Sequence, residues 1–137
     1  MRFVFDTNVI VSALLFKDSL PRRAFDAALD RGKILISTPV LEELDRVLSR
    51  EKFNRYVGAI DRNRFLAALV REAEWVAVTT TVNVCRDPKD NMFLELAVSG
   101  DASAIISGDS DLLALSPFRG VAVLSPEAFL SSIKSGK

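Results

Sequence analysis

The sequence predicts an α/β protein: a three-layer α/β/α sandwich around a central parallel sheet of about five strands. Short apolar runs alternate with amphipathic helical patterns along the chain, which is typical of α/β domains. The strand-like runs, such as FVF at residues 3–5 and AII at residues 104–106, are apolar throughout, as expected for parallel strands that are covered on both faces. Because no linker or low-complexity tract interrupts the pattern, residues 1–137 are expected to form a single domain.

The expected elements follow the chain in order. Strands are expected at Arg2–Asp6, Lys33–Ser37, Trp75–Val78, Ala104–Ser107 and Val121–Leu124. Helices are expected at Asn8–Phe16, Leu20–Arg31, Pro39–Arg50, Arg62–Ala73, Asn91–Ser99, Ser110–Leu115 and Pro126–Ile133. Thr38 is expected to cap the third helix, with Pro39 at its first helical position.

The composition restricts the chemistry that the chain can perform. With 18 basic and 18 acidic residues the formal net charge is zero, so any contact with nucleic acid must come from a local basic patch. The chain has no histidine, which excludes Ser-His-Asp catalysis, histidine-ligated zinc and histidine general bases. Cys85 is the single cysteine, which fits a reducing cytoplasm, and no segment has the apolar length of a membrane span. If the protein is a hydrolase, carboxylates or a metal ion must do the work.

Two expected strands lead into acidic residues. The run FVF is followed by Asp6, and the run AIIS leads through Gly108 to Asp109. Open parallel sheets bind ligands beyond the carboxyl ends of their strands, so a site is expected where these two ends meet. Each acid also has a simpler explanation as a helix cap, and Thr7 and Asn8 next to Asp6 suit the same role.

The third expected helix carries two neighbouring glutamates. When residues are placed at 100° steps, Glu42 lies nearly opposite the apolar stripe, where it can pair with Arg46 in solvent. Glu43 lies on the flank of the stripe, where it can reach the edge of a cleft. Glu43 is therefore the better functional candidate, although an ordinary surface position is the commonest place for a glutamate on a helix.

Further acids stand at the starts of two later helices. Asp90 falls near the centre of the apolar face of its helix, whereas Glu95 points away from that face. An inward acid at a helix start is either an N-terminal cap or a ligand for a cation. Asp87 precedes a proline and is explained by turn chemistry, and a supporting role behind the metal ligands is its alternative. Asp111, two residues after Asp109, adds more acid than a cap requires.

An α/β fold would bring Asp6, Asp90 and Asp109 to one edge of the sheet. Carboxylates placed together repel one another and raise each other's pKa. A hard divalent cation relieves this repulsion, and Mg²⁺ or Mn²⁺ prefers carboxylate ligands. Such an ion can also activate a water and neutralise a leaving oxygen, which is the chemistry of phosphodiester hydrolysis. This chemistry needs no histidine.

The ordered set of motifs resembles the PIN-domain superfamily over nearly the whole chain. The similar segments are FDTNV at residues 5–9, an S…EL helix, DPKDNMFLELA at residues 87–97 and SGDSDLL at residues 107–113. The greatest similarity is to VapC-type toxins of toxin–antitoxin systems. The resemblance implies a three-layer α/β/α fold and an endoribonuclease that depends on Mg²⁺ or Mn²⁺. It also implies a homodimer that is restrained by a cognate antitoxin.

The resemblance also implies roles for individual residues, carried over position by position. The core catalytic acids would be Asp6, Glu43, Asp90 and Asp109. The metal ligands would be Asp6, Asp90, Asp109 and the supporting Asp111. The polar residues beside the metal would be Thr7, Asn8 and Ser107. Glu43 would orient the attacking water.

RNA contact requires basic residues around the acidic site. One stretch of the sequence offers four candidates, which are Arg46, Arg50, Lys52 and Arg55. Phe53 and Tyr56 are interleaved with them and could stack an unpaired base. A solvated helix end and loop is the simpler explanation of the same residues.

Other function classes fit less of the sequence. A catalytically silent PIN-like module would bind RNA without cutting it, and a DNA-directed nuclease would use the same acids. A phosphoryl-transfer protein would want a DxD-type signature after the first strand, where this chain has Asn8 in the second acidic position. Nucleotide-binding dehydrogenases are disfavoured because the chain has neither GxGxxG nor a P-loop.

Overall fold

The computed structural model describes residues 1–135, which contain one five-stranded sheet. The strands are β1 (Arg2–Phe5), β2 (Lys33–Ile36), β3 (Glu74–Trp75), β4 (Ala104–Ile106) and β5 (Ala122–Leu124). All neighbouring strands are parallel, in the order β3-β2-β1-β4-β5. The predicted parallel sheet of five strands is confirmed.

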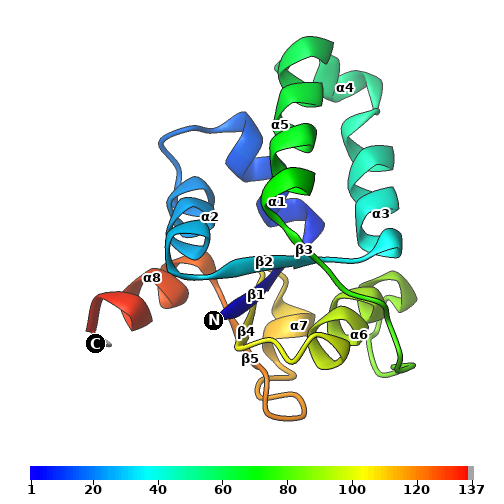
Figure 1. The fold of residues 1–137 in the computed structure, drawn as a ribbon, viewed down its shortest axis with the longest axis vertical. Coiled ribbons are helices and arrows are strands. Elements are labelled where there is room, and N and C mark those ends of the chain that lie inside the picture. Colours follow the sequence, from blue (N-terminus) through cyan, green and yellow to red (C-terminus); the bar gives the residue numbers. More distant parts are fainter. Residues whose placement is uncertain (136–137) are drawn as a thin grey trace.

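Helices cover both faces of this sheet (Figure 1). One side carries α1 (Thr7–Leu15), α2 (Leu20–Arg31), α3 (Thr38–Leu48), α4 (Glu51–Asn54) and α5 (Ala59–Glu72). The other side carries the short helix η1 (Pro88–Asp90), α6 (Asn91–Ser99) and α7 (Ser110–Leu113). The last helix, α8 (Pro126–Ser135), packs against α2 and β5. The predicted three-layer sandwich is therefore confirmed. None of the described helices has both the length and the apolar character needed to cross a membrane.

The central strands are buried on both faces, as their uninterrupted apolar sequences predict. Phe3, Val4 and Phe5 of β1 and Ile105 of β4 are almost completely excluded from solvent. The ring of Phe3 packs edge-on against Phe129 of α8, with 5.1 Å between the ring centroids. Burial of one such side chain contributes about 1.5–3 kcal/mol. This packing holds the carboxyl ends of β1 and β4 in fixed positions.

The prediction that Thr38 caps α3 is wrong. The cap is Ser37, whose hydroxyl oxygen accepts a hydrogen bond from the backbone N–H of Val40 (3.4 Å). Thr38 and Pro39 occupy the first two helical positions. Serine and threonine both cap helices well, so the residue types did not decide which one would be used. The chain leaves β2 one residue earlier than predicted.

Two other elements differ from the sequence prediction. α4 was expected to be part of a helix end and loop, because four residues are too few for a periodic pattern. The strand predicted at Trp75–Val78 is shorter, because β3 ends at Trp75. The backbone N–H of Val76 still donates a hydrogen bond to the Ile36 carbonyl of β2 (2.9 Å). Beyond Val76 the chain turns to α6. The other predicted boundaries lie within three residues of the observed ones.

We expect Leu94→Ala to reduce the free energy of unfolding by about 2–5 kcal/mol, because it leaves a cavity where a fully buried side chain of α6 was. Ile60→Ala, at an exposed position of α5, is the matched control and should change this free energy by less than about 0.5 kcal/mol. Urea unfolding of both variants checks the expectation. Equal losses in the two variants would contradict the described core.

Candidate active site

The carboxyl ends of β1 and β4 lie side by side. The chain places β2 and β3 on one side of β1 and β4 and β5 on the other, so the direction of winding changes between β1 and β4. Phe5 pairs with Ile106, and the backbone N–H of Asp6 donates to the Ile106 carbonyl (3.1 Å). Asp6 and Asp109, which follow these two strands, are thereby brought to the same edge.

Asp6 is buried and held by two hydrogen bonds. One carboxylate oxygen accepts from the backbone N–H of Val9 (2.9 Å) and caps α1, and the other accepts from the Ser107 hydroxyl. The Ser107 oxygen in turn accepts from the backbone N–H of Asp109 (3.0 Å) and so connects the two acids. Burial raises the pKa of Asp6, the bonds from Ser107 and Val9 oppose that rise, and the charge of Asp109 adds to it.

Asp90 faces Asp109 from the start of α6. Its side chain makes no capping hydrogen bond, so helix capping does not account for its position. Instead its carboxyl group lies close enough to that of Asp109 for a hydrogen bond between them when Asp90 is protonated. Burial, this hydrogen bond, and the charges of Asp109, Asp87 and Asp6 raise the pKa of Asp90 to about 6. Asp90 therefore keeps its proton to a higher pH than an ordinary aspartate does.

These acids line one cavity of about 270 Å³, which we call the acidic cavity. Its acidic lining residues are Asp6, Glu43, Asp87, Asp90 and Asp109. Its cationic lining residues are Arg46, Arg50, Lys52 and Lys89. Thr7 and Asn8, at the start of α1, also line it. Four separated parts of the chain therefore contribute acids to one space, and cations stand beside them.

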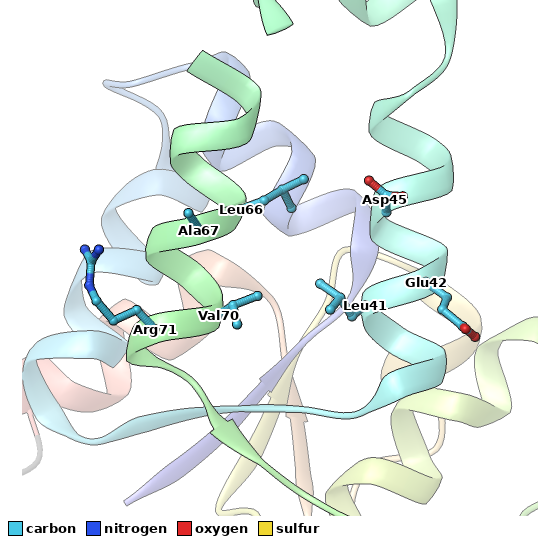
Figure 2. A pocket seen from close by; sticks show the side chains of 7 residues that line it. All are labelled: Leu41, Glu42, Asp45, Leu66, Ala67, Val70 and Arg71. Carbon is cyan, nitrogen blue, oxygen red and sulfur yellow. The ribbon is translucent and has the colours of Figure 1, made fainter. Parts of the chain in front are cut away.

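Glu43 and Glu42 lie at different cavities although they are neighbours on α3. Glu43 lines the acidic cavity and forms an ion pair with Arg46. Arg46 thus pairs with Glu43, whereas the sequence analysis expected it to pair with Glu42. Glu42 lies instead at a groove between α3 and α5 (Figure 2).

That groove is larger than the acidic cavity but mainly apolar. It has a volume of about 570 Å³. Figure 2 shows Leu41 of α3 and Leu66 and Val70 of α5 pointing into it, with Glu42 on the outer side of α3. Asp45 also lines this groove. Hydrolysis needs convergent polar groups, and these lie at the acidic cavity rather than in this groove.

Residues 2–111 match the sequence profile of the PIN domain. The chain belongs to the PIN-domain family. Over 119 residues it is 32% identical to the uncharacterized protein MJ1680 of Methanocaldococcus jannaschii. The matched residues cover 84% of this chain and 75% of that protein. Two solved structures show the same fold at low sequence identity.

One of these structures is VapBC2 from Rickettsia felis, bound to a DNA fragment from its promoter. The similarity has a TM-score of 0.62 at 14% identity and covers 90% of this chain and 97% of that one. The other is PAE2754 from Pyrobaculum aerophilum, with a TM-score of 0.66 at 15% identity over 98% of this chain and 91% of that one. Both similarities extend over nearly the whole PIN domain described here.

Some residues named from the sequence do not line the acidic cavity of this PIN domain. Arg55 is exposed and is not among the lining residues. Asp111 is also exposed, and its backbone N–H donates to the Asp109 side chain (2.9 Å). Ser107 lies behind Asp6 rather than at the cavity surface. The sequence analysis did not name Lys89, although its place between Asp87 and Asp90 was an available signal.

The donors of the PIN-domain site suit a hard divalent cation. Carboxylate oxygens are the ligands that Mg²⁺ and Mn²⁺ prefer. The buried hydroxyl of Thr7 has no hydrogen-bond partner within residues 1–135, and buried hydroxyls normally have one. Within the same residues no three acidic or cysteine side chains are grouped closely enough to hold a metal ion as they stand.

We expect the stability of the metal-free protein to fall as the pH rises from about 4 to about 6. An unfolded aspartate loses its proton near pH 3.8, whereas folded Asp90 keeps its proton up to about pH 6 because its pKa is raised. The folded state binds more protons in this window, so the free energy of unfolding decreases with pH there. In Asp90→Asn the free energy of unfolding should fall less over this range. The variant should therefore be more stable than wild type at pH 8, but not at pH 4. Urea unfolding with a chelator tests this, and a difference that does not change with pH would contradict it.

Proposed function

We propose that this PIN domain is a metal-dependent endoribonuclease that hydrolyses RNA phosphodiester bonds, and that it is the toxin of a type II toxin–antitoxin pair. The acidic cavity carries the proposal, because carboxylates from four parts of the chain face one another there beside four cations. PIN domains are generally nucleases that use divalent metals, which supports the same assignment.

The proposed metal ligands are Asp6, Asp90 and Asp109, with Asp111 in support. Mg²⁺ or Mn²⁺ at these acids would neutralise charge on the phosphate and activate water. Asp6 suits this role because Val9 and Ser107 fix both of its oxygens in one orientation. The raised pKa values of Asp6 and Asp90 fit a site that is completed by positive charge.

The remaining polar groups would orient water and substrate. Glu43 would orient the attacking water from α3, and its ion pair with Arg46 restrains its side chain. The unpartnered Thr7 hydroxyl can donate a hydrogen bond to a phosphate oxygen or to a water. Asn8, which lines the same cavity, offers an amide for the same purpose. Glu43 would act from α3, and Thr7 and Asn8 would act from the start of α1.

The basic residues beside the acids would hold the RNA backbone. Arg50 and Lys52 line the acidic cavity near the junction of α3 and α4. Phe53 also lines it, and the Lys52 ammonium lies 5.2 Å from the centre of its ring. Because the formal net charge is zero, binding of phosphates needs a local basic patch such as this one.

The proposed partners are a cognate antitoxin and a second copy of the chain, in the cytoplasm. The shared fold with the VapBC2 structure supports an antitoxin partner. Free activity of a ribonuclease would harm the cell that makes it, so a restraining partner fits the proposed activity.

We expect Asp6→Asn and Glu43→Gln each to lower the rate of RNA cleavage in Mn²⁺ by at least about 100-fold, because each removes a charged group from the reacting site. Glu42→Gln is the matched control: it changes the adjacent residue on α3, which lies at the apolar groove, and should cleave like wild type. The measurement is single-turnover cleavage of a panel of structured and unstructured RNAs, with Mn²⁺, Mg²⁺ or a chelator.

The other outcomes of this measurement decide between function classes. Activity that persists in the chelator, or in Asp6→Asn, would refute the metal-dependent mechanism. Wild-type protein that binds RNA but cuts none of the panel would indicate a silent binding module. Preferential cleavage of matched DNA would replace the ribonuclease by a DNA-directed nuclease of the same fold.

We expect the double charge reversal Arg50→Glu, Lys52→Glu to weaken RNA binding and to lower the slope of log K against log salt by about 1–2, because about two phosphate contacts are lost. Arg55→Glu is the control, since Arg55 does not line the acidic cavity. Fluorescence anisotropy over a salt series measures both effects. Equal effects of reversal at Arg55 and at the other two positions would argue against this patch as the RNA-binding surface.

A further inference from the structure

The segment that joins β3 to α6 is held along one face of α6. Residues 79–85 form no described strand, and the chain runs beside the helix before it turns into it (Figure 1). Three polar residues of α6, Asn91, Glu95 and Ser99, are spaced four apart, so they lie in one row on the helix. We call them the polar row of α6.

Side chains at the far end of the polar row supply hydrogen-bond acceptors to the segment, which has no neighbouring strand to supply them. Ser99 accepts a hydrogen bond from the backbone N–H of Thr79 (3.0 Å), and Glu95 accepts one from Val82 (3.0 Å). The Val82 side chain is buried in the core at the same point. Backbone N–H groups of an irregular segment need such acceptors, so the row fixes the path of the chain toward the acidic cavity.

Asn91 stands at the other end of the row and makes three hydrogen bonds. Its Oδ1 accepts from the backbone N–H groups of Val84 (3.1 Å) and Cys85 (3.0 Å), and its Nδ2 donates to the Pro88 carbonyl (3.1 Å). Asn91 is 7% exposed. An amide can accept and donate at the same time, which a carboxylate or an alanine cannot do. Asn91 therefore ties both ends of the loop 84–88 to the first turn of α6.

This loop carries Asp87 into the acidic cavity. Asp87 lines the cavity, and its side chain accepts from the backbone N–H of Lys89 (3.0 Å). Its carbonyl accepts from the backbone N–H of Asp90 (3.0 Å). The place of Asp87 relative to Asp90 thus depends on the loop that Asn91 closes. The sequence analysis explained Asp87 by turn chemistry, with a supporting role near the metal as the alternative; its side chain makes the turn bond and also lines the cavity.

We propose that Asn91 is a positioning residue of the cation site and acts by holding Asp87 in the cavity as a further carboxylate toward the cation. The inference rests on the proposed function, because it presupposes a cation at these acids. Loss of a residue that orients the groups around a metal typically weakens metal binding by about 10–100-fold. Ser99, at the far end of the same row, holds only the start of the segment.

Mn²⁺ binding to the purified protein, measured from the EPR signal of free Mn²⁺, tests this role without an activity assay. We expect Asn91→Ala and Asp87→Asn each to weaken Mn²⁺ binding by about 10-fold. The double variant should lose no more Mn²⁺ affinity than the single variant with the larger loss, because Asn91 acts through Asp87. Ser99→Ala also removes one hydrogen bond between α6 and the segment, and it should bind Mn²⁺ like wild type.

Two results would overturn the role of Asn91. One is an Asn91→Ala protein with a lowered Tm and unchanged Mn²⁺ binding, which is what a merely structural asparagine would give. The other is a double variant whose losses add independently. If Asn91→Ala does not fold, Asn91→Ser takes its place with the same expected loss, since its short hydroxyl cannot make all three bonds.

Asp6→Asn in the same binding assay separates this inference from the proposed function. Unchanged Mn²⁺ binding in Asp6→Asn would contradict the proposed metal site itself, and the role of Asn91 with it. Lost binding in Asp6→Asn together with unchanged binding in Asn91→Ala would contradict only the role of Asn91.

Discussion

Mutual repulsion among carboxylates at the joined ends of β1 and β4 is the constraint on which this site depends. The strand order makes β1 and β4 neighbours, so Asp6 and Asp109 lie at the same edge of the sheet. The start of α6 places Asp90 beside them. Crowded and partly buried carboxylates must either retain a proton or bind positive charge. Below about pH 6 the free protein can use the proton, because burial and a hydrogen bond with Asp109 help to raise the pKa of Asp90 to about 6. A divalent cation would be the alternative partner for the same oxygens.

Much of this arrangement could be predicted from the sequence because buried parallel strands leave a strong pattern. The apolar runs at residues 3–5 and 104–106 fix two strands, and the acid that follows each run must then lie at the carboxyl edge of the sheet. Asp90 could be selected because it falls on the inward face of its helix, where a cap or a cation ligand is expected. Each position alone also fitted a helix cap, so the prediction of a site depended on the acids occurring together at one edge of the sheet.

The rest depends on contacts that leave no periodic signal. Glu95 does point away from the apolar face of α6, as its sequence position indicates, but the backbone of residues 79–85 covers it. An irregular segment that bonds to side chains has neither the alternation of a strand nor the period of a helix. For the same reason the three bonds of Asn91 could not be foreseen. The choice of Ser37 over Thr38 as a cap depends on where β2 ends, which differs by one residue from the predicted end.

The most direct test of the central claim is a crystal structure of the protein grown with Mn²⁺, with anomalous scattering used to locate the ion. We expect an anomalous peak about 2.0–2.4 Å from carboxylate oxygens of Asp6 and of Asp90 or Asp109. Carboxylates left in their metal-free positions, with no peak between them at saturating Mn²⁺, would contradict the claim that a cation satisfies this edge of the sheet.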